Sequence, residues 1–138
     1  MIEDDELREV FKVASEEHLQ NLDDGFLHLE KNPGDTEKLE ELLREAHSLK
    51  GDAGMLGVKD VSTLAHQIEH ILGGLNRGET EFSPEVSDRL FQGLDALRKL
   101  VAEAITGEPS GVNTFHVLAN LMGAKEPEAG EAGEAEEA

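Results

Sequence analysis

Apolar residues recur every three or four positions through four long stretches of the chain, and this spacing constrains the fold more than any other feature. In residues 4–31 the stripe consists of Leu7, Val10, Phe11, Ala14, His18, Leu22, Phe26 and Leu29. Similar stripes fill residues 36–56, a segment from about Asp60 to Asn76, and a segment from Pro84 to the break at Gly107. A period of about 3.6 residues puts each stripe on one side of a helix, so each stretch predicts an amphipathic helix.

Turn and capping residues separate these segments. The sequence Asn-Pro-Gly-Asp at 32–35 breaks the first helix, Gly57 stands where a glycine often ends a helix, and Ser-Pro at 83–84 is typical of a helix start. After the break at 107–111, residues 112–122 predict a short fifth helix. Long helices with short connections pack as antiparallel neighbours, so we expect an all-α fold: an antiparallel up-down four-helix bundle with a short fifth C-terminal helix.

The composition agrees with a helical core. Aromatic residues make up only 4% of the chain, and Trp, Tyr and Cys are absent, so the core must consist mainly of Leu, Val, Ile and Ala. Without cysteine there are no disulfides and no thiolate metal ligands. Residues 124–138 contain almost only Ala, Gly and Glu. We therefore expect a folded domain over 1–123 and a disordered acidic tail or linker over 124–138, which would fit a piece cut from a longer protein.

The charge balance limits the classes of partner. The net charge is −19, from 12 basic and 31 acidic residues. Such a surface repels nucleic-acid phosphates and anionic lipid, so neither nucleic acid nor membrane is an expected partner. No apolar run is long enough to span a membrane, and the N-terminal residues lack the pattern of a signal peptide. We expect a soluble, cytoplasmic protein.

Residues 46–57, AHSLKGDAGMLG, interrupt the second helix with glycines. On a helical projection, His47, Lys50, Gly51 and Gly54 share an arc that lies away from the apolar stripe. Interior glycine costs a helix about 0.5–1 kcal/mol relative to alanine, so helix stability does not explain these residues. An exposed imidazole beside a flat, backbone-accessible surface indicates a site that another molecule approaches closely.

The third helix carries a second polar pair, His66 and Glu69, three residues apart and therefore neighbours on the helix surface. If the second and third helices pack together, Glu69 can reach an imidazole on the second helix. A histidine on a helix flank is nevertheless most often a solvated side chain, and a lysine there is most often surface charge.

The segment HSLKGDAG resembles the His-x-x-Lys-Gly core of histidine phosphotransfer domains. Together with Leu-Ala-His-x-x-Glu-x-x-Leu at 64–72 and the following Asn-Arg-Gly-Glu turn, it resembles the amino-terminal domain of chemotaxis-type histidine kinases, the CheA family. The resemblance covers about residues 4–122 and includes the short fifth helix.

This resemblance implies a role for each residue of the motifs. His47 would be phosphorylated on Nε2, Glu69 would accept a hydrogen bond from its Nδ1–H, and Lys50 would place a positive charge near the phosphoryl oxygens. His66 would complete the polar network, while Gly51 and Gly54 would leave room for the partners. Asp52 departs from the small residue common among relatives, and the projection points it away from His47, so we expect a mild effect.

The resemblance also implies partners. A CheA-type kinase ATP-binding domain would supply the phosphoryl group, and a response-regulator receiver domain would accept it on an aspartate. ATP and Mg²⁺ would be used by those partner domains, and we expect no cofactor or metal bound to this domain itself. The isolated domain would be a monomeric phosphoryl acceptor and donor and not an enzyme, although its full-length parent would be a protein histidine kinase.

Two other interpretations remain open from the residues alone. The sequence His66-Gln67-Ile68-Glu69-His70 matches the H-x-x-E-H pattern of a class of zinc metalloproteases, although a small bundle offers little room for a substrate cleft. Alternatively, the chain is a non-catalytic helical interaction module whose glycines serve only close helix packing.

Overall fold

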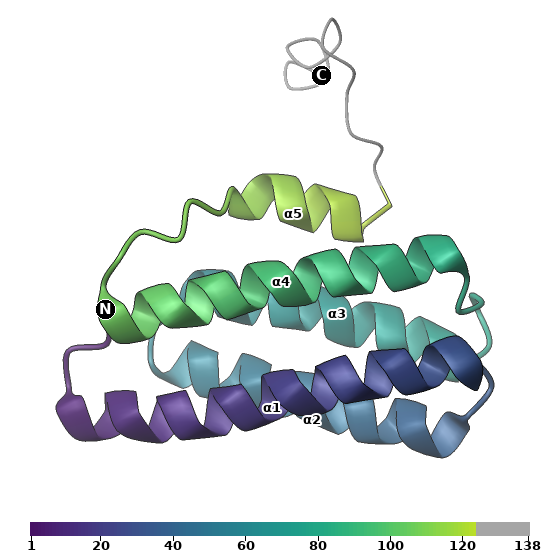
Figure 1. Cartoon of the computed structure of the whole chain (residues 1–138), viewed down its shortest axis with the longest axis horizontal. Helices are drawn as coiled ribbons and strands as arrows, with labels where there is room; N and C mark the ends of the chain where they lie inside the picture. Colours follow the sequence, from purple (N-terminus) through teal and green to yellow (C-terminus); the bar gives the residue numbers. More distant parts are fainter. Residues whose placement is uncertain (124–138) are drawn as a thin grey trace, which may run out of the picture.

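A computed structural model describes residues 1–123, which form five helices and no strand. They are α1 (Asp5–Lys31), α2 (Thr36–Met55), α3 (Lys59–Asn76), α4 (Pro84–Thr106) and α5 (Thr114–Leu121). The first four pack as an antiparallel bundle, with α5 lying across α3 and α4 (Figure 1). The predicted fold class is therefore confirmed. The tail expected over 124–138 lies outside the described residues.

The helices begin where the sequence supplies capping side chains. Asp4, Asp35, Ser83 and Asn113 each accept a hydrogen bond from the backbone N–H three residues further on, and these four residues are the N-caps of α1, α2, α4 and α5. At the other end of α2, Gly57 adopts a φ of 75°, a left-handed conformation that favours glycine. The helix limits predicted from the sequence thus agree with the structure to within one or two residues.

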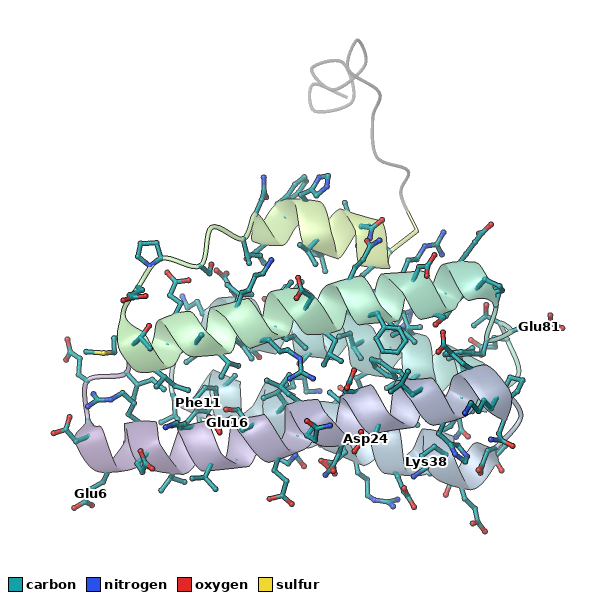
Figure 2. The ribbon with its side chains drawn as sticks, in the orientation of Figure 1. Glu6, Phe11, Glu16, Asp24, Lys38 and Glu81 are labelled. Atoms are coloured by element: carbon teal, nitrogen blue, oxygen red, sulfur yellow. The ribbon has the colours of Figure 1, made fainter. Side chains whose placement is uncertain are left out.

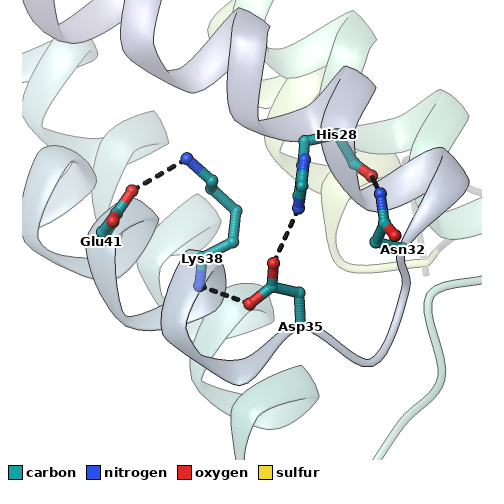
Figure 3. Close-up of polar contacts among 5 residues, drawn as sticks. All are labelled: His28, Asn32, Asp35, Lys38 and Glu41. Carbon is teal, nitrogen blue, oxygen red and sulfur yellow. Dashed lines mark hydrogen bonds and ion pairs between the residues drawn. The ribbon is translucent and has the colours of Figure 1, made fainter.

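The turn between α1 and α2 is held by a chain of polar contacts (Figure 3). Asp35 caps α2 with one carboxylate oxygen and contacts His28 Nε2 of α1 with the other, at 2.7 Å. Both hydrogen bonds lower the pKa of the Asp35 carboxyl, and the hydrogen bond with His28 has the larger effect. Asp35 therefore links the end of α1 to the start of α2 and stabilises the short antiparallel connection between them.

The core is built from most of the predicted apolar stripes, but Leu7 and Val10 of the first stripe are 47% and 66% exposed and lie outside it. Phe26 and Phe91 pack edge to face with ring centroids 5.6 Å apart, and Phe11 points into the bundle while Glu6 points away from it (Figure 2). Other fully buried side chains are Leu22, Leu29, Leu42, Leu49, Leu64, Ile68, Leu72, Leu90, Leu94 and Leu97. No helix within residues 1–123 is long and apolar enough to cross a membrane.

Two glycines allow the helices to approach closely. A Cβ added at Gly25 of α1 would lie 2.2 Å from Leu42 Cδ2 of α2, and one at Gly93 of α4 would lie 2.9 Å from Leu121 Cδ2 of α5. The backbone of Ile2 also donates a hydrogen bond to the carbonyl of Ala104, at 2.9 Å, which ties the N-terminus to the end of α4. The bundle is thereby closed at this end, beside the turn from α2 to α3.

Candidate functional site: an exposed histidine on the α2–α3 face

His47, Lys50 and Glu69 form one hydrogen-bonded group across α2 and α3. Glu69 Oε2 lies 2.7 Å from His47 Nδ1, and Glu69 Oε1 accepts a hydrogen bond from Lys50 Nζ, also at 2.7 Å. A carboxylate only accepts hydrogen bonds, so Nδ1 carries a proton, and in the neutral imidazole Nε2 then carries the lone pair. We call this group, with the neighbouring Gly51 and Gly54, the α2–α3 face.

Exposure differs sharply within the group. The side chain of His47 is 66% exposed, whereas that of Glu69 is only 22% exposed. Within the described residues, Nε2 of His47 has no hydrogen-bond partner. The imidazole is therefore oriented from behind by a half-buried carboxylate and presents a free basic nitrogen to solvent.

The protonation state of Glu69 suits this role. Partial burial by itself raises the pKa of the carboxyl, but the hydrogen bonds from Lys50 and His47 outweigh it, so the pKa is lowered overall. Glu69 thus remains an anionic acceptor at neutral pH.

The two glycines have no packing function inside the chain. A Cβ added at Gly51 would meet nothing within 4 Å, and one at Gly54 would be 3.6 Å from Ser62 Oγ, an ordinary contact. Both residues are exposed. The interpretation of Gly51 and Gly54 as residues required by internal helix packing is therefore not supported.

Ser62 is a feature of this face that the sequence analysis did not identify. Its hydroxyl donates a hydrogen bond to the backbone carbonyl of Lys50, at 3.2 Å, and so joins α3 to α2 beside the site. Ser62 and Glu69 are seven residues apart, which places them on the same side of α3. The sequence signal for Ser62 was its position, a small polar residue two helical turns before Glu69.

The structure separates His66 from this group. His66 is exposed and lines a cavity of about 530 Å³ between α3, α4 and α5, together with His70, Gly74 and Leu121. Within residues 1–123 no hydrogen bond joins it to His47, Lys50 or Glu69. The structure therefore does not join His66 to His47 by a hydrogen bond among the described residues, because its side chain faces the cavity beside α5.

Asp52 points toward α1 and away from His47, and the second part of this placement agrees with its position on the projection. Its Oδ2 lies 3.6 Å from Nε2 of His18, whose Nδ1 lies 2.7 Å from Glu45 Oε1. The His18 side chain is 20% exposed and lies at the edge of the core, where it has one hydrogen bond, between its Nδ1 and Glu45.

The zinc interpretation finds no support in the geometry. The carboxylate of Glu69 is bound to His47 and Lys50, and residues 1–123 contain no group of three or more His, Cys, Asp or Glu side chains placed to hold a metal ion. Two imidazoles of the H-x-x-E-H segment would need a further ligand that this part of the chain does not provide.

Comparison with known proteins agrees with the geometry. Residues 6–104 match the family model of the Hpt domain. The chain is 37% identical over 99 residues to the chemotaxis protein CheA of Halobacterium salinarum and 35% identical over 113 residues to that of Bacillus subtilis. These alignments cover 72% and 82% of the chain but only 15% and 17% of the two relatives.

A solved structure shares the fold as well. The solution structure of the histidine phosphotransfer domain of CheA superposes with a TM-score of 0.75 at 32% identity, covering 86% of this chain and 92% of that one. The five-helix bundle with its exposed histidine thus defines a phosphotransfer module. The chain belongs to the Hpt domain family, in the form found in CheA-type chemotaxis kinases.

Proposed function

We propose that His47 carries a phosphoryl group from ATP, bound to a kinase domain, to an aspartate of a response-regulator receiver domain. The single observation that carries this proposal is the exposed imidazole whose Nδ1–H is held by Glu69 while Nε2 is free. A neutral imidazole with a fixed tautomer and an open nitrogen is a competent nucleophile.

Both transfers balance at Nε2. In the first, the Nε2 lone pair forms a bond to the γ-phosphorus of ATP, the bond from that phosphorus to the bridging oxygen breaks, and ADP leaves. The imidazole keeps its Nδ1 proton, and the carboxylate of Glu69 stabilises the positive charge that develops on the ring. In the second transfer, an aspartate oxygen attacks the phosphorus, the N–P bond breaks and Nε2 recovers its lone pair.

The neighbouring residues support this chemistry from the side. Lys50, 2.7 Å from Glu69, holds a positive charge next to the place where the phosphoryl oxygens arrive. Gly51 and Gly54 leave the backbone of α2 accessible, so that a partner's active site can reach an imidazole that lies on a helix surface.

The proposal includes the protein's context. ATP and Mg²⁺ are handled by the partner domains, and this domain acts as acceptor and donor in a cytoplasmic chemotaxis kinase of the CheA type. The relatives, of which this chain spans 15–17%, have ample length for a kinase domain. A monomeric state of the isolated domain is part of the same proposal.

Labelling tests the proposal directly. The chain is incubated with a chemotaxis-type kinase ATP-binding domain and radiolabelled ATP, and acid-labile, base-stable label is measured. His47→Gln should abolish the label while circular dichroism shows an intact bundle, and His18→Gln is the matched control that should retain it. Label that persists in His47→Gln would contradict the proposal, and a chain that takes no label at all would favour the interaction module.

A further inference from the structure

The cavity between α3, α4 and α5, which we call the α3–α5 cavity, gathers positive charge in a strongly acidic chain. Its charged lining residues are His66, His70, Arg77, Glu79 and Arg89. Two of the chain's five arginines thus face one acidic residue here, whereas the whole chain has 12 basic and 31 acidic residues. Because charges more than about 10 Å apart are largely screened at physiological salt, these local groups determine which ligands the cavity attracts.

Arg89 of α4 brings unused hydrogen-bond donors to the wall of this cavity. Its side chain is only 33% exposed, and the nearest carboxylate oxygen, from Glu85 one turn earlier, is 3.9 Å from Nη2, beyond hydrogen-bond distance. Within residues 1–123 the guanidinium donates no hydrogen bond. A guanidinium has five N–H donors in a planar fork, which matches the oxygens of a carboxylate or a phosphate. Arg89 is therefore suited to hold an oxyanion in the cavity.

Arg77, at the end of α3, adds a second guanidinium that is already partly paired. Its Nε and Nη2 donate hydrogen bonds to Glu79, at 2.8 and 3.2 Å. Its Nη1 lies against Gly73, where an added Cβ would be 2.9 Å away, so the missing side chain lets the guanidinium lie close to α3. Glu79 neutralises one of the two arginines, and the cavity keeps a positive charge that protonation of its histidines increases.

The rest of the cavity wall is largely apolar. Ile71 of α3, Val86 of α4 and Leu121 of α5 line it, and Leu121 is only 3% exposed. The volume of about 530 Å³ lies in the usual range for small-molecule sites, which combine apolar walls with a few convergent polar groups. The cavity therefore suits an organic anion whose oxygens meet the arginines and whose carbon skeleton covers the apolar wall.

We propose that the α3–α5 cavity binds an organic anion through carboxylate or phosphate oxygens held by Arg89 and Arg77. This site is separate from the phosphorylation site, because His47, Lys50 and Glu69 do not line the cavity. Carboxylates can come from a free small molecule or from the glutamates within residues 124–138, which follow the cavity-lining Met122 by a few residues. The same oxyanion chemistry holds for both sources, and the experiment separates them.

Citrate, a tricarboxylate, is the probe, and the backbone amide chemical shifts of His70 and Arg77 are followed by NMR as it is added at constant ionic strength. Arg89→Gln removes the unpaired cation. Arg98→Gln is the matched control, because Arg98 lies on the same helix, is 3.8 Å from the Asp23 carboxylate and does not line the cavity. The dissociation constant should rise about tenfold in Arg89→Gln and less than about twofold in Arg98→Gln.

Glu79→Gln tests the same site in the opposite direction. Loss of the carboxylate charge leaves Arg77 available to the ligand, so the dissociation constant for citrate should fall about threefold. Damage to the fold does not produce such a gain. Weaker binding in this variant would overturn the assigned role of Arg77 and with it the proposal.

The triple variant Glu126→Gln, Glu128→Gln, Glu131→Gln identifies the source of the anion. Tighter citrate binding in this variant supports the proposal with the chain's own glutamates as occupants, and unchanged binding supports it with a free anion. If neither the unsubstituted chain nor the triple variant shows saturable shifts, the proposal is overturned. Equal weakening by Arg89→Gln and Arg98→Gln would also overturn it, since citrate would then respond only to the overall charge of the chain.

Discussion

Helix α2 supplies one residue to each of two histidine–carboxylate pairs, one shared with α1 and the other with α3, and the pairs have the same hydrogen bond but different surroundings. On the α2–α3 face, Nδ1 of His47 lies 2.7 Å from Glu69, and on the flank facing α1, Nδ1 of His18 lies 2.7 Å from Glu45. The first imidazole is 66% exposed and the second 20%. Asp52 approaches Nε2 of His18, while Nε2 of His47 is open.

The difference shows what makes such a pair reactive. A carboxylate on Nδ1 fixes the tautomer and orientation of the imidazole in both places. At His18 the second nitrogen faces the Asp52 carboxylate at 3.6 Å, beyond hydrogen-bond distance, and little of the ring is accessible, so the pair joins two helices. At His47 the second nitrogen is free, so the same bond prepares a nucleophile. Access to Nε2, and not the hydrogen bond itself, separates the two roles.

The glycines of the two flanks differ in the same way. Gly25 lies under Leu42 where α1 meets α2, and its missing Cβ makes room for that side chain. Gly51 faces open space. Gly25 is needed for packing within the folded chain, whereas Gly51 has no such role and is explained by the approach of a partner.

Gly25→Ala should give the largest change in stability. Its Cβ would fall 2.2 Å from a side chain that is 2% exposed, so Leu42 or the helix backbone must move. Overpacking of this severity costs about 3 kcal/mol of unfolding free energy. Urea denaturation measures it, and a loss below about 0.5 kcal/mol would show that α1 and α2 separate more easily than their packing indicates.

Glu69→Gln should slow phosphorylation of His47 about 10–100-fold, because the amide keeps the shape but loses the charge that orients and stabilises the imidazole. Glu45→Gln is the matched control at the other pair and should leave this rate unchanged. Initial rates of label incorporation with a kinase ATP-binding domain provide the measurement. If Glu69→Gln and Glu45→Gln slowed phosphorylation equally, the functional distinction between the His47 pair and the His18 pair would be wrong.

The same carboxylate predicts a dependence of stability on pH. The pKa of Glu69 is lower in the folded chain than the ordinary value of 4.5, so its ionised form stabilises the fold above that pH. This contribution is lost as the pH falls from about 4.5 through the lower folded-state pKa. The difference in unfolding free energy between the unsubstituted chain and Glu69→Gln should therefore shrink as the pH falls below 4.5, as chemical denaturation at several pH values can show. A difference that grows with acidification would contradict the assigned ion pair.

Sequence reasoning reached the helices because their signals are local. Periodicity, the caps at Asp35 and Ser83, and Gly57 act within one or two turns of the chain. The contact between His47 and Glu69 needed the family resemblance as well, since it depends on which helices are neighbours.

Features set by the register between helices were missed. Two examples are the clash that a side chain at Gly25 would cause and the contacts of His18 with Glu45 and Asp52. Both depend on which residues of α1 and α2 face each other. His66 was placed in the network by analogy, but its position on α3 turns it toward the cavity beside α5. Spacing along one helix does not determine such contacts across helices.

Gly51→Ala and Gly54→Ala should give the smallest change in stability and the one of opposite sign. Neither added Cβ meets a close neighbour, and alanine is the better helix former, so each substitution should stabilise the fold by about 0.5–1 kcal/mol. Both should nevertheless slow phosphotransfer at His47, because a methyl group now stands where a partner must approach. Urea denaturation and label transfer, measured on the same samples, separate the two effects. A gain in stability with an unchanged transfer rate would mean that the partners approach His47 from the side of Lys50, and that the open arc of α2 serves no docking purpose.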